Sequence, residues 1–372
     1  MIQDLTKGKK IKVAISHGDI NGISYEVIIK ALKDKRILEM FTPVIYGLSK
    51  TLAYYRKNLN FNDFNYKIIN DAQYAFNQKV NIVNLSNEEI KIECGKSTEI
   101  AGNFAYRALE AAIKDIKEDK VQVLVTAPLN KSNIQSSEFE FPGHTEYLAH
   151  KFESRSALML MVHDNLRVGT VTGHIPIKLV SESITEDLVF EKIAVLNDSL
   201  IKDFGIEKPK IAVLSLNPHA GDKGVIGDED QQIVSPALVR SQEKGILSYG
   251  PFAADGFFGS DTYRKYDAIL AMYHDQGLIP FKTLAFEGGV NFTAGLTVVR
   301  TSPAHGTAYD KAGKNISSCS AMREALYLAI DIYKKREKYN EMTKDPLPSG
   351  LMMDYNNGRN NREPEELQHA QD

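Results

Sequence analysis

Short apolar runs alternate with amphipathic stretches along the first part of the chain, and each apolar run ends in polar residues. Residues 11–16 (IKVAIS) have the composition of a buried strand, and residues 25–32 have helical periodicity. The same patterns predict strands at 43–46, 66–69, 80–85 and 121–125 and an amphipathic helix at 98–116. Strands that alternate with helices favour an α/β fold with a mostly parallel sheet.

The alternation continues through the rest of the chain. Its patterns predict strands at 157–162, 167–171, 210–214 and 268–272, and helices at 147–152, 187–204 and 320–337. With 372 residues and 43% hydrophobic content the chain can fill two moderate cores, so we expect two domains. The last part of the chain is rich in Asn, Glu and Gln and poor in aliphatic residues, which predicts a flexible tail.

Charge and cysteine content narrow the class of protein. The 45 basic and 48 acidic residues are spread along the chain and give a net charge of −3, so no basic face for nucleic acid is indicated. Cys94 and Cys319 lack the spacing of a disulfide framework or a thiolate zinc site, so we expect a reducing cytoplasm. The first residues (MIQDLTKGKK) lack an apolar signal core and no long apolar run follows, so we expect no membrane segment.

Histidines follow three of the predicted strands. His174, His219 and His274 each come shortly after an apolar run, near glycine or proline. Ligands of open α/β sheets bind at the carboxyl ends of strands, and neutral imidazole is a common ligand of divalent metals. Each histidine alone is an ordinary polar loop residue, because the spacing carries no signature such as HExxH. Their shared placement predicts a three-ligand metal site with an open position, which is the catalytic type.

The segment after residue 272 carries side chains suited to an anion. Lys282, Asn291 and Arg300 supply two cations and an amide that can converge on one phosphate or carboxylate. Upstream, Thr145 is placed to cap the helix at 147–152, and a helix N-terminus attracts anions. Its neighbour His144 is either a capping or surface residue or a further contact to the anion.

Two glycine-bearing segments are candidates for nucleotide binding. His305, Gly306, Thr307 and Ala308, with Gly313 behind them, form a loop that lets a flat ligand approach the backbone closely. The stretch 18–24 (GDINGIS) lacks GxGxxG spacing, so it favours a tight turn over direct phosphate binding. A metal site beside an anion clamp and a nucleotide loop points to oxidation of a phosphorylated alcohol.

Seven strings, spread over nearly the whole chain to about residue 338, resemble one enzyme family. They are TAPLNK, PGHTE, VTGHIP, LNPHAG, YHDQGLIPFK, VNFTAGL and VRTSPAHGTA, in family order. By these strings the chain is similar to the 4-hydroxythreonine-4-phosphate dehydrogenases, the metal-dependent enzymes of pyridoxal phosphate (vitamin B6) biosynthesis. The resemblance implies NAD- or NADP-linked oxidation of 4-phosphooxy-L-threonine to a β-keto acid, which loses carbon dioxide to give 3-amino-2-oxopropyl phosphate.

The resemblance also implies roles for residues. By this resemblance, His174, His219 and His274 would be the ligands of one divalent ion (zinc, magnesium or cobalt). Loop 305–313 would bind the adenosine of the nicotinamide cofactor. The contacts to the phosphorylated substrate would be His144, Thr145, Lys282, Asn291 and Arg300. Members of the family are homodimers in which the third metal histidine, here His274, reaches the site of the partner subunit.

The fold implied by the resemblance is like that of isocitrate and isopropylmalate dehydrogenases, with two α/β/α domains around a cleft, and it is not a GxGxxG Rossmann domain. Residues 1–130 with 301–340 would form the first domain, residues 131–300 the second, and residues 341–372 the tail.

The chain departs from the family pattern at three places. The family reads GDPAGIGPE, PADT and DHGTA where this chain has GDINGISYE, AADG and AHGTA, and these changes spare the metal and phosphate residues. Asp255 and Asp275 are candidates for orienting a ligand or accepting the proton. A dehydrogenase of a related compound such as threonate 4-phosphate would share the metal and anion sets. A non-catalytic phosphoanion-binding protein is the alternative of a different class.

Overall fold

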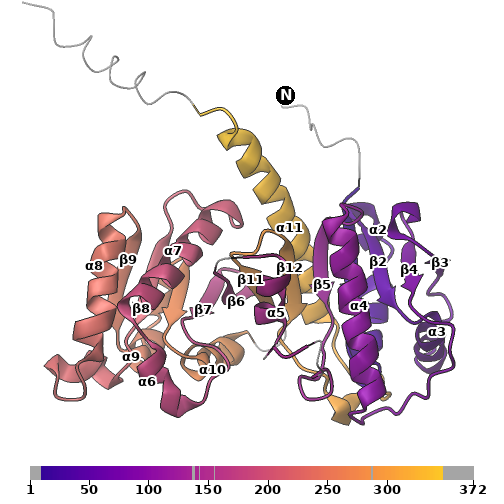
Figure 1. Cartoon of the computed structure of the whole chain (residues 1–372), viewed down its shortest axis with the longest axis horizontal. Helices are drawn as coiled ribbons and strands as arrows, with labels where there is room; N and C mark the ends of the chain where they lie inside the picture. The colour runs from indigo at the N-terminus through magenta and orange to yellow at the C-terminus, as the bar shows by residue number, and fades with distance from the viewer. Residues whose placement is uncertain (1–9, 136–138, 142, 155, 286–287, 347–372) are drawn as a thin grey trace, which may run out of the picture.

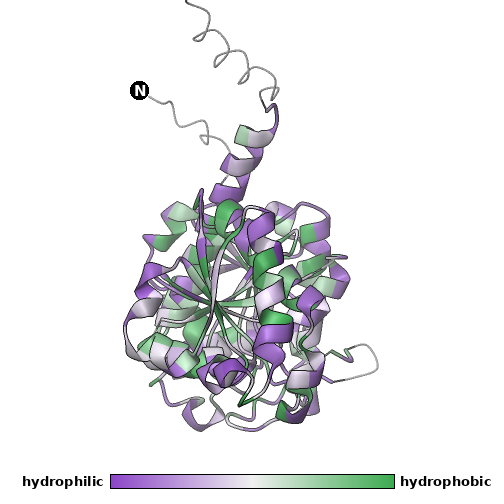
Figure 2. Cartoon of the chain, turned by 90° about the vertical axis from the view of Figure 1, so that its left-hand side faces the viewer, coloured by the Kyte–Doolittle hydropathy of each residue, from purple (hydrophilic) through white to green (hydrophobic). Residues whose placement is uncertain are grey.

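The computed structural model describes residues 10–135, 139–141, 143–154, 156–285 and 288–346. Over these residues one sheet of 12 strands runs through the whole molecule (Figure 1). Viewed from one end of the sheet, the strands lie in the middle and are mostly hydrophobic, and the helices around them carry both hydrophilic and hydrophobic residues (Figure 2). The strands are β1 (Lys12–Ser16), β2 (Thr42–Gly47), β3 (Tyr66–Ile69), β4 (Val80–Asn84), β5 (Val123–Thr126), β6 (Leu158–His163), β7 (Leu166–Thr170), β8 (Lys210–Leu214), β9 (Leu247–Phe252), β10 (Ala268–Ala271), β11 (Val290–Ala294) and β12 (Val299–Pro303).

The sheet is mostly parallel, as predicted. Its order is β3-β4-β2-β1-β5-β12-β11-β6-β7-β10-β8-β9, and the antiparallel pairings lie in the middle, between β12 and β11, β11 and β6, and β6 and β7. The chain builds one side with β1 to β5, crosses to the other for β6 to β10, and returns through β11 and β12. Because β12 pairs with β5 and β11 with β6, the sheet is continuous, and the division into two domains stays a prediction.

Helices cover both faces of the sheet. They are α1 (Ser24–Leu32), α2 (Ile37–Met40), α3 (Ser49–Asn58), α4 (Glu99–Lys117), α5 (His144–Lys151), α6 (Val180–Ser183), α7 (Glu186–Lys202), α8 (Ser235–Glu243), α9 (Ala254–Gly259), α10 (His274–Leu284) and α11 (Ser320–Thr343). The Thr98 hydroxyl caps α4 by accepting a hydrogen bond from the Ala101 amide at 3.3 Å, a contact that stabilises a helix by about 1 kcal/mol. The buried face of α4 carries Ala105, Ala108 and Ala112, whose small side chains let it lie close to β1 and β2.

The strands and helices predicted from periodicity are confirmed. Several further elements of the fold were not predicted from the hydrophobic pattern. Gly250 and Pro251 interrupt the apolar run of β9, and α10 begins at His274, where we expected a loop, and continues through Pro280. In the predicted tail, α11 extends to Thr343, and residues 347–372 lie outside the described residues. Within the described part of the chain, no helix combines the length and apolarity needed to cross a bilayer.

Candidate active site

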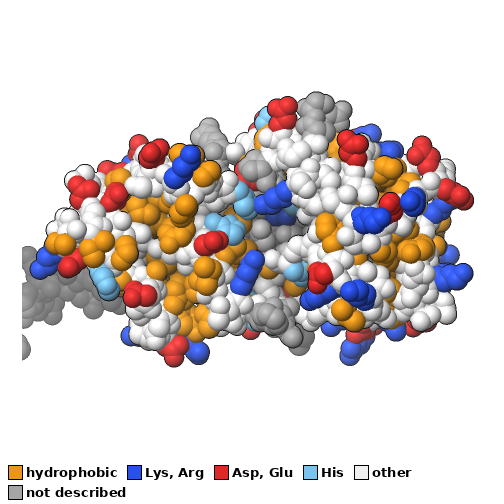
Figure 3. Space-filling model, turned by 90° about the horizontal axis from the view of Figure 1, so that it is seen from below, with side chains coloured by type: hydrophobic (Ala, Val, Ile, Leu, Met, Phe, Trp, Pro, Cys, Tyr) orange, Lys and Arg blue, Asp and Glu red, His pale blue; other side chains and the backbone are white. Residues whose placement is uncertain are grey.

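A cavity of about 250 Å³ lies over one face of the central antiparallel strands, where the molecule is visibly hollowed (Figure 3). Met161 on β6, Asn291 on β11 and Ser302 on β12 form its floor, since the sheet register places Asn291 opposite both of the others. Met159 and Arg300, two positions away on β6 and β12, share the same face because side chains alternate along a strand. The floor therefore comes from three strands that are neighbours only in the folded sheet.

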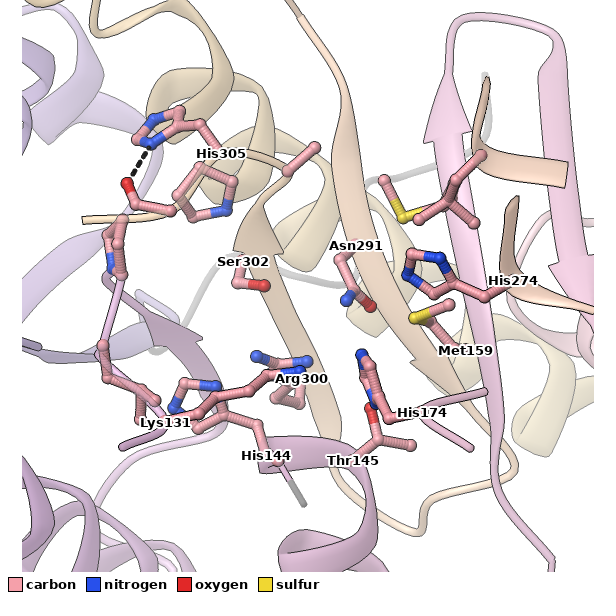
Figure 4. A pocket seen from close by; sticks show the side chains of 18 of the residues that line it. Lys131, His144, Thr145, Met159, His174, His274, Asn291, Arg300, Ser302 and His305 are labelled. Atoms are coloured by element: carbon pink, nitrogen blue, oxygen red, sulfur yellow. Dashed lines mark hydrogen bonds between the residues drawn. The ribbon is translucent and has the colours of Figure 1, made fainter. Parts of the chain in front are cut away.

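Loops from both sides of the sheet form the walls of this cavity. On one side are the loops after β5 and β12, which contribute Lys131 and His305, and the first turn of α5, which contributes His144. On the other side are His174, which follows β7, and His274, at the start of α10 after β10. Figure 4 shows Arg300 between the two groups. The cavity thus brings cationic side chains and a pair of imidazoles to one volume.

Arg300 is a buried cation that lines the cavity. It is 1% exposed, and its guanidinium donates hydrogen bonds to the Thr126 hydroxyl at 2.7 and 3.2 Å and to the Thr293 hydroxyl at 3.2 Å. Burial lowers the pKa of Arg300 to about 9, so the side chain is still charged at neutral pH. No ion pair joins it to an acidic residue in the described part of the chain. Because an unpaired buried charge is costly, an anion in the cavity would complete this site.

Further groups suited to an anion surround Arg300. Lys282 and Lys131 line the cavity, and Asn291 lines it with a carboxamide whose NH₂ group can donate to an anion. Burial, together with Arg300 and Lys131, holds the pKa of His144 well below its usual value, so His144 is a neutral imidazole with one N–H to donate. Thr145 lies in the first turn of α5 and lines the cavity, but it does not cap the helix as predicted, because Gly143 is the N-cap residue.

His174 and His274 face each other across the cavity. Their ring centroids are 5.4 Å apart, and two imidazoles that ligate one ion at about 2.0–2.1 Å have centroids at a comparable separation of roughly 5–6 Å. Nδ1 of His274 is 2.7 Å from the Asp275 carboxylate. A carboxylate on one ring nitrogen fixes the ring and leaves Nε2 free to ligate. This pair therefore fits a divalent metal, and Asp275 is placed to orient one ligand.

His219, the third predicted ligand, lies apart from the cavity. It is exposed on a turn after β8 with a backbone φ of 52°. Asp230 holds the start of this loop, because its carboxylate accepts hydrogen bonds from the Leu216 amide at 2.7 Å and the Asn217 amide at 2.9 Å. Within the described residues of one chain, no group of three His, Cys, Asp or Glu side chains is arranged to hold a metal. The resemblance implied that His274 is the ligand belonging to a partner's site, yet His274 shares a cavity with His174.

The predicted cofactor loop contributes two residues to the cavity. His305 and Gly306 line it, and the buried Nε2 of His305 has no hydrogen-bond partner among the described atoms. A Cβ built on Gly306 would have nothing within 4 Å, so a flat group can approach the backbone there. Thr307, Ala308 and Gly313 do not line the cavity.

Asp255 is an exposed residue in the first turn of α9, outside the cavity of the described chain. Two other cavity residues, Lys131 and Glu146, were not singled out from the sequence, although the strings TAPLNK and PGHTE contain them. Glu146 Oε1 is 3.8 Å from Nδ1 of His174, and its buried Oε2 has no hydrogen-bond partner among the described atoms. Burial acts to raise the pKa of Glu146, but His174 and Lys131 outweigh it, so the pKa lies below its usual range.

Comparison with known proteins places the site in a family context. Residues 39–329 match the model of the pyridoxal phosphate biosynthetic protein PdxA family. The chain is 50% identical over 339 residues to the 4-hydroxythreonine-4-phosphate dehydrogenase of Bacteroides thetaiotaomicron, covering 91% of this chain and 93% of that protein. It is 36% identical over 324 residues to the D-threonate 4-phosphate dehydrogenase of Salmonella typhimurium, covering 86% of this chain and 98% of that protein. The solved 4-hydroxythreonine-4-phosphate dehydrogenase of Klebsiella pneumoniae superimposes with a TM-score of 0.74 at 33% identity, covering 88% of this chain and 99% of that one.

Proposed function

The chain belongs to the pyridoxal phosphate biosynthetic protein PdxA family, and from this premise we propose that it is a dehydrogenase of 4-phosphooxy-L-threonine. In this reaction the hydroxyl on C3 gives its proton to a base, and C3 itself gives a hydride to NAD or NADP. The resulting β-keto acid releases carbon dioxide and leaves 3-amino-2-oxopropyl phosphate. The observation that carries this proposal is Arg300, a buried cation that forms no ion pair with a described residue, in a cavity that also holds a pair of facing histidines.

The chain's cationic and amide groups bind the phosphate end of this substrate. Arg300 and Lys282 supply positive charge, and the neutral His144 supplies one N–H. The guanidinium presents several donors in a rigid fork, which suits the tetrahedral oxygens of a phosphate. Anchoring the phosphate there fixes where the hydroxyl at C3 can lie, so binding energy is used to orient the reacting carbon.

The facing histidines define the reacting end of the cavity. His174 and His274 would hold a divalent ion, which when bound supplies a Lewis acid that stabilises negative charge on the hydroxyl oxygen. Asp275 holds the His274 ring through Nδ1. The exposed backbone at Gly306 leaves room for the nicotinamide cofactor, which accepts the hydride.

Glu146 favours an amino acid over a hydroxy acid as the substrate. It is the acidic side chain that lines the described cavity, and its buried Oε2 lacks a hydrogen-bond donor. The α-ammonium of 4-phosphooxy-L-threonine would supply that donor together with an opposite charge. Threonate 4-phosphate carries a hydroxyl at this carbon, which can donate a hydrogen bond but brings no charge to pair with the carboxylate. We therefore place threonate 4-phosphate second.

A direct test compares turnover of the two compounds. With divalent metal and either NAD or NADP, we expect faster reduction of the cofactor with 4-phosphooxy-L-threonine, accompanied by release of carbon dioxide. Glu146→Gln should lower kcat/KM for this compound about tenfold or more and change kcat/KM for threonate 4-phosphate far less. Faster turnover of threonate 4-phosphate by the unaltered protein would favour the second substrate. Binding of phosphate without turnover of either compound would favour a non-catalytic protein.

We further propose that a second copy of the chain completes the metal site. His174 and His274 share one cavity while His219 is exposed outside it, so His219 is the ligand that a partner subunit would have to supply. This assignment differs from the role that the resemblance gave to His274. Hydrogen bonds from the loop's backbone to the Asp230 carboxylate fix the start of this loop, so the loop can present the exposed His219 to another molecule.

Subunit mixing distinguishes the two assignments. When His174→Ala and His219→Ala dimers exchange subunits, each mixed dimer should contain one site with both lesions and one intact site. Random exchange then restores roughly a quarter of the unaltered activity, given the two-fold symmetry usual for dimers. Mixing His174→Ala with His274→Ala should restore nothing, because both lesions arise within one chain's share of the site. Recovery with the second pair only would return the shared role to His274.

A further inference from the structure

Loops from three neighbouring strands meet beside the cofactor end of the cavity. β1, β5 and β12 are parallel neighbours, so their carboxyl ends lie together. Asp19 lies in the turn after β1, Asn130 and Asn133 follow β5, and Tyr309 follows β12. None of these residues lines the cavity, yet they form a connected set of hydrogen bonds.

Asp19 is the centre of this set. Its side chain is 0% exposed, and three donors reach its carboxylate: the Asn21 amide at 2.8 Å, Nδ2 of Asn133 at 2.9 Å and the Tyr309 hydroxyl at 2.7 Å. No ion pair joins Asp19 to a basic residue in the described part of the chain. A buried carboxylate is costly unless it is fully hydrogen-bonded, so losing one donor leaves a penalty that the loops must relax to relieve.

Tyr309 connects this carboxylate to the loop that carries His305 and Gly306. Its hydroxyl donates to Asp19 and accepts a hydrogen bond from Nδ2 of Asn130 at 3.0 Å. The same loop is held at a second point, because the Thr307 carbonyl accepts a hydrogen bond from the Ile23 amide at 3.0 Å. Any Cβ at Gly22 would come within 2.7 Å of that carbonyl oxygen, so the turn and the loop are in close backbone contact.

We propose that Asp19 and Tyr309 form a latch that positions loop 304–309 for the nicotinamide cofactor. The inference rests on the proposed function, because it takes the group bound at Gly306 to be that cofactor. A loop fixed before binding does not have to be ordered by the ligand, so the latch strengthens cofactor binding without touching the cofactor. Asp19 and Tyr309 are therefore positioning residues.

Tyr309→Phe removes the latch hydroxyl and leaves the ring. We expect the Kd of the reduced cofactor, measured by its fluorescence on binding to the metal-loaded protein, to rise about tenfold or more, as expected for one hydrogen bond to a charged acceptor. The KM of the oxidised cofactor should rise in parallel, while the KM of the phosphorylated substrate and the affinity for divalent metal stay unchanged. Tyr74→Phe, at a tyrosine that is 67% exposed, is the matched control.

An unchanged cofactor Kd in Tyr309→Phe would overturn the latch, and so would equal weakening of cofactor, substrate and metal. Asp19→Ala and the double variant complete the test. Both single changes remove the hydrogen bond between Tyr309 and Asp19, so their effects on cofactor affinity should be less than additive. If Asp19→Ala does not fold, Tyr309→Phe still decides the matter. Failure of the unaltered protein to bind either NADH or NADPH would contradict the proposed function itself, which is a separate result from an ineffective Tyr309→Phe change.

Discussion

Removal of divalent metal is expected to lower turnover of 4-phosphooxy-L-threonine by about a thousandfold or more, because charge stabilisation by a bound ion supplies several kcal/mol of the barrier reduction. The facing pair His174 and His274 motivates this expectation. Chelator-treated protein should regain activity on addition of one divalent ion, and comparison of zinc, magnesium and cobalt identifies which ion serves. His174→Ala should bind that ion more weakly in a calorimetric titration and should show a comparable loss of activity.

A histidine outside the cavity provides the control for this experiment. His150 is an exposed residue on α5, the helix whose first turn lines the site, so His150→Ala should keep both metal affinity and turnover. Full activity in a preparation that elemental analysis shows to be free of metal would contradict the metal site. Unchanged metal affinity in His174→Ala would move the site elsewhere in the protein.

The second large effect is expected at Arg300. Arg300→Lys should lower kcat/KM for the phosphorylated substrate by more than tenfold, which corresponds to at least about 1.4 kcal/mol of transition-state binding. An ammonium group cannot reproduce the guanidinium fork, which here bonds to the Thr126 and Thr293 hydroxyls. Arg300→Met should cost more, since it removes the charge as well. Inorganic phosphate should also lose potency as a competitive inhibitor of both variants.

Thermal unfolding of the Arg300 variants distinguishes a role in binding the phosphate from a role in stabilising the fold. Arg300 is a buried cation whose charged form is disfavoured by burial, so replacing it with an apolar side chain of similar length should not greatly lower the melting temperature. Arg264→Lys, at an arginine side chain that is 70% exposed, is the matched control and should behave like the unaltered protein. If Arg300→Lys handles the phosphorylated substrate normally, Arg300 only ties β12 to β5 through Thr126, and the anion must bind elsewhere.

Several of the site's residues could be recognised before the fold was known, because the signals for them are local. A buried strand is a short apolar run, and polar residues that follow it stand at its end whatever its neighbours are. Such runs predicted β7, β8 and β10 and thereby singled out His174, His219 and His274. Arg300 was recognisable as a charge in an apolar segment, and the structure buries it to 1% exposure. Matching strings to a family then supplied the substrate, which no periodicity encodes.

Local periodicity and residue type were sufficient to predict the α/β class, most strands and helices, and the residue types of the candidate site. The pairing of strands far apart in the chain became known only from the fold, because pairing depends on the packing of the whole sheet and not on local periodicity. The central strands reverse direction, so the cavity floor is a row of Met161, Asn291 and Ser302 across one face of the sheet. The same packing joins His174 to His274 and leaves His219 and Asp255 outside the cavity. It also brings the Tyr309 hydroxyl to the Asp19 carboxylate. These residues are 290 positions apart, so no local pattern could predict their hydrogen bond.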